Sequence, residues 1–233
     1  MIDGCINLPI RDNLVRLDNN RIARLPILYA TLTDEPSKSN NKYMMLYDIS
    51  KLHLPLSLPG NILKSEFDPD KISYGHSKTQ PSEILDNSLI ELLYNNGILV
   101  PNVQLFRFPP SLITTVPHID DDGIDDQVNL NYVVNSGSST IIWYKLKEHH
   151  TGYIASGLTG ATPRRYHPRD VTQIYTTTSV GACLFQSGVP HAVLNTENDR
   201  KCISIKLRDF NKNPIRWEDA IIIFKEWISC TSV

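Results

Sequence analysis

The second half of the chain alternates between short apolar runs and polar breaks, a pattern typical of a protein built from β-strands. Residues that favour strands recur in short runs, and Pro, Gly, Asn, Asp and Ser separate these runs. Strands spaced in this way are typical of a sandwich or barrel of the jelly-roll type. The eight predicted strands are Val103–Phe108, Leu112–Asp120, Gln127–Val134, Thr140–Leu146, Thr172–Thr178, Ala182–Gln186, His191–Asn195 and Lys201–Arg208.

Helical periodicity flanks this region on both sides. Apolar residues at helical spacing predict a helix near residues 82–96, with Ser82 as its cap and Gly97 as a left-handed stop. A second helix is expected over residues 213–229, capped by Asn213. The sequence therefore predicts a mainly β protein with flanking helices.

No stretch has the composition of a linker, so we expect a single domain over residues 1–233. Within it, residues 1–102 would buttress the barrel and residues 103–208 would form the jelly-roll core. The interval between the fourth and fifth strands, residues 147–171, is long for a connection inside a compact domain, which is typical of a functional loop.

Composition narrows the class of protein and of its partners. Hydrophobic residues make up 41% and charged residues 21%, so the chain can bury a core. A net charge of -2 argues against a dedicated nucleic-acid binder. No apolar run approaches the ~20 residues of a membrane span, and no basic and apolar leader is visible. The scattered cysteines, without a CxxC, favour a cytoplasmic protein.

The triplet His118-Ile119-Asp120 is the first candidate for chemistry. Residues two apart in a strand point to the same side, about 7 Å apart along the backbone, so an imidazole and a carboxylate can converge on one metal ion. By itself the triplet is a weak signal, because a loop histidine beside an acidic turn has the same sequence.

A third donor stands 73 residues further on, where His191 opens the seventh predicted strand after a Gly-Pro turn. Two histidines and one carboxylate occupy one face of an octahedral metal and leave three positions open, which is the arrangement of non-haem Fe(II) oxygenases. We therefore take His118, Asp120 and His191 as candidate metal ligands and catalytic residues.

Arg200 opens the eighth predicted strand, nine residues after His191. The alternation of this strand turns Ile203 and Ile205 toward the apolar packing layer, so Arg200 and Ser204 would face into the barrel. A buried arginine needs an anionic partner, and its planar guanidinium fits a carboxylate through two hydrogen bonds.

At these residues the sequence resembles the Fe(II)/2-oxoglutarate-dependent dioxygenases, and by texture the small prolyl- or aspartyl-hydroxylase type. The resemblance covers roughly residues 103–208 and implies a double-stranded β-helix, the cupin-like jelly roll. It also implies Fe(II), with 2-oxoglutarate and O2 as cosubstrates. His118, Asp120 and His191 would bind iron, and Arg200 would hold the far carboxylate of 2-oxoglutarate.

The third strand of such enzymes often carries a polar residue that faces the cosubstrate. Asn129 and Asn131 stand there, and we favour Asn131; an arginine often occupies the place of Asn129 in the hydroxylase subgroup. The resemblance implies hydroxylation of a small polar metabolite, such as an amino acid, or of a peptide side chain, with release of succinate and CO2.

Two other functions fit the same residues. A metal-binding cupin could catalyse chemistry that needs no 2-oxoglutarate, with Arg200 as a substrate ligand. A non-catalytic jelly roll could serve as a structural or carbohydrate-binding module. The basic run Pro163–Arg169 in the long loop is interpreted as a solvated segment or as a lid that binds an anionic substrate group.

Overall fold

The structure is a computed structural model that describes residues 16–17, 21–22, 52–110, 115–120, 127–135, 139–147, 152–154, 163–178, 181–195 and 199–229. The chain forms two compact units, Met1–Asp48 with Cys230–Val233, and Ile49–Ser229. In the first unit, β1 (Arg16–Leu17) pairs antiparallel with β2 (Arg21–Ile22). The domain boundaries expected from the sequence, including a buttressing role for residues 1–102, stay predictions.

Two antiparallel six-stranded sheets make up the second unit. The sheet that we call the β6 sheet has the order β11 (Val171–Thr178), β8 (Thr140–Leu146), β13 (His191–Leu194), β6 (His118–Ile119), β10 (Arg164–Arg165), β9 (Tyr153–Ile154). The β14 sheet has the order β3 (His53–Pro55), β12 (Gly181–Gln186), β7 (Val128–Asn135), β14 (Arg200–Lys206), β5 (Val103–Phe108), β4 (Gly75–Thr79).

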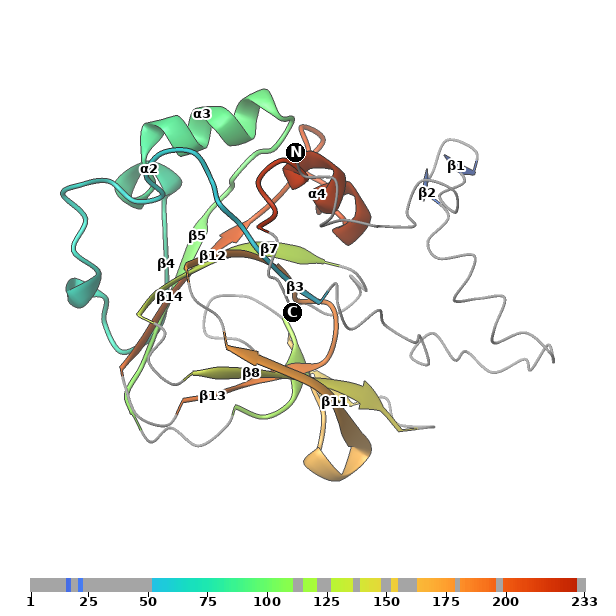
Figure 1. Ribbon diagram of the computed structural model, residues 1–233. Coiled ribbons are helices and arrows are strands. Elements are labelled where there is room, and N and C mark those ends of the chain that lie inside the picture. The colour runs from blue at the N-terminus through green and yellow to red at the C-terminus, as the bar shows by residue number, and fades with distance from the viewer. Residues whose placement is uncertain are drawn as a thin grey trace. The chain divides into compact units, whose positions relative to one another are not determined.

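The order of the strands is that of a jelly roll. Strands β5, β7, β12 and β14 lie together in one sheet, whereas β6, β8, β11 and β13 lie together in the other, so the chain passes repeatedly between the two layers (Figure 1). This confirms the predicted fold, a mainly β protein with a double-stranded β-helix at its centre.

The eight predicted strands are all present, with small shifts at their ends. The largest difference concerns the second, which is a strand only over His118–Ile119; residues 112–114 of its predicted span lie outside the described residues. Pro117 directly precedes this strand. Because proline has no N–H to donate to a sheet, the strand does not extend further toward the N-terminus. The short β3, β4, β9 and β10 extend the two sheets.

The helix predicted near residues 82–96 is two helices, α2 (Pro81–Ile84) and α3 (Asn87–Asn95). Asp86 interrupts it, because its carboxylate accepts hydrogen bonds from the Ser88 N–H (2.9 Å) and hydroxyl (2.6 Å) and so caps α3. The prediction that Ser82 is the cap was therefore wrong. The stop was correct, since Gly97 has φ 79° at the end of α3.

The helix predicted over residues 213–229 is α4 (Trp217–Phe224). Asn213 does not cap it. Its backbone N–H and its side-chain amide both donate to the carboxylate of Asp209, at 2.7 and 3.0 Å, and hold the turn that precedes the helix. Arg216 occupies the cap position instead, without a side-chain hydrogen bond. No helix in the described ranges has the length and hydropathy needed to cross a bilayer.

The two faces of the β14 sheet differ in chemistry. Figure 1 shows α2, α3 and α4 on the side of this sheet that faces away from the β6 sheet. Toward the helices, β14 presents apolar residues such as Ile203 and Ile205, both 0% exposed. Toward the β6 sheet it presents Arg200, Ser204 and Lys206, which are also buried. Burying polar groups without hydrogen-bond partners costs free energy, so the polar side chains of this inner face need partners.

The interval over residues 147–171 contains structure of its own. Within its described residues it forms β9, β10 and the 3-10 helix η3 (Pro168–Asp170). Gly152 adopts φ 64° just before β9, and a Cβ there would lie 2.6 Å from the carbonyl oxygen of Arg165 and from the ring of Tyr166. Only glycine permits this approach, which holds the edge strand β9 against β10.

His53 on β3 makes the stability of this fold dependent on pH. Burial lowers the pKa of His53 to about 4, and its ring lies edge-on to that of Trp143 at 6.2 Å. The unfolded chain therefore binds a proton between about pH 6.5 and 4 that the folded chain does not bind. We expect the free energy of unfolding to fall as the pH drops through this window, by up to about 1.4 kcal/mol per pH unit from this group.

Urea denaturation of the metal-free protein at a series of pH values would measure this dependence. The variant His53→Gln should have a shallower slope between pH 6.5 and 4. An equal slope in the variant and the parent would show that His53 does not contribute to it.

Candidate metal centre

Three side chains from two neighbouring strands converge on one point. His118 lies on β6, Asp120 directly follows it, and His191 opens β13 as the cross-strand partner of His118. Partners in an antiparallel pair share one face of the sheet. One ligand atom of each of the three residues lies within 4.8 Å of the others.

The donor atoms face one another directly. The Asp120 Oδ1 atom lies 3.6 Å from Nε2 of His118 and 3.5 Å from Nε2 of His191. The two imidazole rings have their centroids 4.6 Å apart. The sequence-predicted triad is therefore brought together at one site, in a geometry that can hold a metal ion.

Backbone carbonyl groups fix both histidines in the state that a metal requires. Nδ1 of His118 lies 2.8 Å from the carbonyl oxygen of Val116, and Nδ1 of His191 lies 2.8 Å from that of Val189. A carbonyl oxygen can only accept, so each Nδ1 carries the proton and donates it. Each Nε2 is then left with a free lone pair directed at the common point.

The two oxygens of Asp120 have different partners. Oδ2 accepts a hydrogen bond from Nδ2 of Asn129 at 2.9 Å and lies 3.8 Å from Nζ of Lys206. The backbone N–H of Asp120 donates to the Ser187 carbonyl at 3.2 Å. These contacts hold the carboxylate in one orientation and leave Oδ1 to face the histidines, as expected for a ligand that binds through one oxygen.

The ionisation states suit metal binding. Burial would raise the pKa of Asp120, but its close contact with Nε2 of His191 and the charge of Lys206 together lower it well below the usual range. Burial lowers the pKa of His118 to about 4, and the neighbouring His191 and the charge of Arg165 act in the same direction. At neutral pH, Asp120 is thus a carboxylate and His118 a neutral imidazole, so a metal displaces no proton from either.

The donor set fits a divalent transition metal. Two imidazole nitrogens and one carboxylate oxygen are the protein ligands of non-haem Fe(II) enzymes and also of some catalytic zinc sites. In both, the protein leaves coordination positions open for a substrate. The side chain of His118 is 23% exposed whereas that of His191 is 4% exposed, so the site is accessible from the β6 side.

Arg200 and Asn131 lie on the same inner face as Lys206. Arg200 is 5% exposed at the first position of β14, and its Nε has no hydrogen-bond partner among the described residues. Asn131 is the cross-strand partner of Ser204, and its Oδ1 is likewise buried and unpartnered within the described ranges. Both side chains are therefore buried on the inner face, and their roles as cosubstrate ligands stay predictions.

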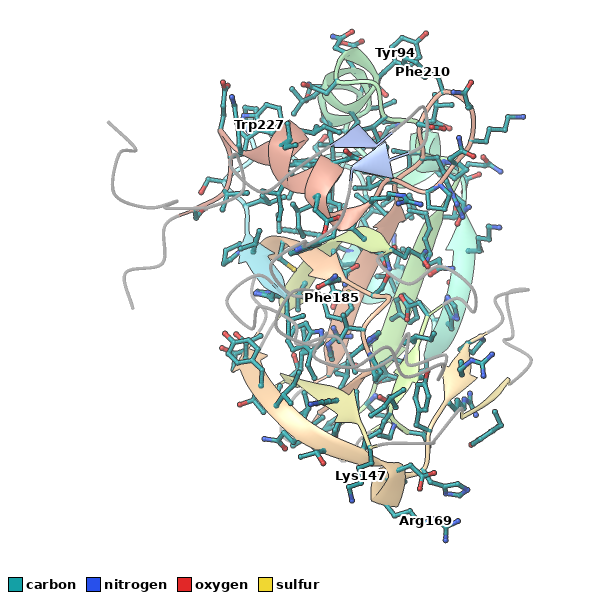
Figure 2. The ribbon with its side chains drawn as sticks, turned by 90° about the vertical axis from the view of Figure 1, so that its right-hand side faces the viewer. Tyr94, Lys147, Arg169, Phe185, Phe210 and Trp227 are labelled. Carbon is teal, nitrogen blue, oxygen red and sulfur yellow. The ribbon has the colours of Figure 1, made fainter. Side chains whose placement is uncertain are left out.

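An apolar wall backs the metal site. The ring of Phe185, on β12, meets His191 edge-on at 4.7 Å and lies 5.2 Å from Trp143. Figure 2 shows Phe185 in the interior, between the two sheets. This wall keeps water from the back of the site, where His191 is most buried.

Sequence reasoning missed two further groups near the triad. Lys206 follows Arg200 by six residues, so the alternation of β14 could have identified it. His76 gave no signal, because only the pairing of β4 with β5 brings it to this face, where its ring stacks on Phe106 at 4.2 Å. The pKa of His76 is lowered, mainly by burial. The charge of Asp120 opposes this shift, and the charge of Lys206 adds to it.

No protein-family model and no curated protein matches this chain. Among solved structures, two crystal structures of a vicilin from Solanum melongena, one of them a re-refinement, are each 10% identical with a TM-score of 0.29. The alignments cover 67% and 72% of this chain, and the chain spans 41% and 43% of the vicilin chains.

The strand order and the His-Asp-His group together define the class of this protein. It is a cupin-like jelly roll that carries a candidate metal centre between its two sheets. The donor set defines the kind of site.

Removal of one ligand should abolish tight metal binding. We expect His118→Ala to weaken Fe(II) or Co(II) binding by more than the roughly 10- to 100-fold that is typical for loss of an outer-shell contact. Metal content after reconstitution and desalting measures this. His167→Ala removes an exposed histidine of the same sheet edge and should retain the metal. Equal metal content in the two variants would contradict the assignment.

The hydrogen bond from Asn129 should tune the centre without supplying a ligand. We expect Asn129→Ala to weaken metal binding about tenfold, because Asp120 Oδ2 loses the donor that orients it. Competition with a chelator of known affinity measures the change. An affinity equal to that of the parent would show that Lys206 alone suffices to orient the carboxylate.

Proposed function

We propose that the protein is a non-haem Fe(II)/2-oxoglutarate-dependent oxygenase that hydroxylates a small polar metabolite or a peptide side chain. The observation that carries the proposal is the placement of the His-Asp-His group and a buried arginine on facing surfaces of one barrel. Bound Fe(II), with O2, would convert 2-oxoglutarate to succinate and CO2 and a substrate C–H bond to C–OH.

The three open positions of a facial triad suit a chelating cosubstrate together with O2. His118, Asp120 and His191 would hold the iron, with each imidazole already in the required tautomer. The residues perform no redox chemistry themselves. Their contribution is a fixed geometry, since the contacts of Asp120 with Asn129 and Lys206 prevent it from turning away.

Arg200 would bind the far carboxylate of 2-oxoglutarate. It is buried, its Nε is unpartnered in the described part of the chain, and its planar fork can donate two parallel hydrogen bonds to a carboxylate. No ion pair of Arg200 is found within the described residues, and a buried guanidinium is stabilised by an anion, which the far carboxylate would supply.

Asn131 and Ser204 would line the path between the iron and Arg200. They are paired across β7 and β14, and Ser204 lies between Arg200 and Lys206 along its strand. The amide of Asn131 would contact the cosubstrate by donating from Nδ2 to a carboxylate oxygen, while its Oδ1 has no partner among the described residues. The dicarboxylate would thus lie along the polar inner face of β14, with one end at the metal and the other at the arginine.

Anaerobic titration with Fe(II) and 2-oxoglutarate tests this function. We expect a weak visible absorption band when both are present, and succinate when air is admitted. Stoichiometric metal binding with neither the band nor succinate would instead favour a metal-binding cupin that does not use 2-oxoglutarate.

The role of Arg200 predicts a specific loss. We expect Arg200→Ala to raise the dissociation constant of 2-oxoglutarate about 10- to 100-fold while Fe(II) remains bound, because a charge-assisted hydrogen-bond pair is lost. Arg200→Lys retains the charge but not the planar guanidinium, so its dissociation constant for 2-oxoglutarate should lie between those of Arg200→Ala and the parent. An unchanged constant in both variants would remove Arg200 from this role.

A further inference from the structure

The strand β10 places a second arginine beside the metal centre. Arg165 is the cross-strand partner of His118 in the antiparallel pair of β10 with β6. Directly opposed residues project from the same face, with Cβ atoms roughly 5 Å apart. The side chain of Arg165 therefore starts beside a metal ligand and on the same face of the sheet.

The backbone of Arg165 is held firmly. The neighbouring Tyr166 is 1% exposed, and its N–H donates to the carbonyl oxygen of Pro117 at 2.8 Å. On the other side, Gly152 approaches so closely that a Cβ would clash with the Arg165 carbonyl at 2.6 Å. The part of the backbone that carries the Arg165 side chain is therefore held in place beside the metal centre.

Arg165 is a cation beside the metal centre to which the proposed function assigns no partner. Lys206 lies at Asp120, and Arg200 is assigned to the cosubstrate. Arg165 is exposed and makes no ion pair within the ranges that the structure describes. It also stands on the accessible side of the centre, next to the more exposed of the two ligand histidines.

A second polar group, His76, lies on the strand that extends the opposite sheet at the same edge. The connection from β5 to β6 joins the two sheets there, and β4 continues beyond β5 just as β10 continues beyond β6. His76 on β4 stacks on Phe106, and its Nε2 is buried and has no partner among the described residues. A substrate that enters at this edge would meet a cation on one sheet and a ring nitrogen on the other.

From this arrangement we propose that the substrate carries a free carboxylate bound by Arg165, so that it is an amino acid or a similarly small acid and not a residue inside a peptide. A guanidinium fork matches a carboxylate, and the interior of a peptide has none to offer. Because Arg165 is paired with His118 across the strands, the carbon to be oxidised would lie close to that carboxylate. This inference rests on the proposed oxygenase function.

The test compares acids with their amides on the full-length, Fe(II)-loaded protein. The common amino acids and simple aliphatic acids, each paired with its primary amide, are added with 2-oxoglutarate under air, and succinate and hydroxylated product are measured. We expect at least one acid to raise succinate release above the rate without substrate, and its amide to be at least about tenfold less effective.

Variants give a second, independent readout. Arg165→Gln should raise the KM for the effective acid about 10- to 100-fold, and Arg165→Lys less. Arg169→Gln is the matched control, since Arg169 belongs to the same segment, is 83% exposed in its side chain and points away from the protein in Figure 2. Melting temperature and metal content of each variant show whether it is folded.

Three outcomes would overturn the inference: amides as effective as acids, an unchanged KM in Arg165→Gln, or no stimulation by any acid while 2-oxoglutarate is still slowly consumed. All three leave the proposed function intact. The failure of the parent protein to bind or consume 2-oxoglutarate would instead remove the proposed function itself, so the two failures are distinguishable.

Discussion

Two hydrogen bonds hold the imidazole rings of the metal centre, and the rest of the site depends on them. Each ligand histidine donates from Nδ1 to the carbonyl oxygen two residues before it, Val116 for His118 and Val189 for His191. Because a carbonyl accepts only, these contacts fix the tautomer and the ring orientation together. Both Nε2 atoms then meet Asp120 Oδ1 at about the same distance.

The β14 strand supports this centre by dividing its two faces. Ile203 and Ile205 bind it into the apolar layer under the helices, which gives the strand a rigid position. The opposite face carries Arg200, Ser204 and Lys206, which are buried. Their desolvation costs free energy, and a purely structural role would not offset it. A protein can hold such a polar face in its interior when the layer behind it supplies the stability, and a ligand supplies the missing partners.

Much of the fold followed from the alternation of apolar and polar residues, since the strands from Val103 onward are short, regularly spaced and bounded by turn residues. The candidate triad was also predictable, because His118 and Asp120 are two apart in a strand and a single histidine opens the seventh one. The ends of the helices were less so. Asp86 competes with Ser82 as a cap, and the side chain of Asn213 binds Asp209, choices that depend on local geometry. The position of His76 near the site could not be predicted, because it depends on the pairing of β4 with β5, which no sequence pattern indicates.

The most direct test of the central claim is to locate the metal. Crystals of the Fe(II)-loaded protein, with diffraction measured at the iron absorption edge, should show one anomalous peak about 2.0–2.2 Å from Nε2 of His118, Nε2 of His191 and an oxygen of Asp120. A peak bound by other residues, or none at this point in protein with stoichiometric iron, would contradict the account.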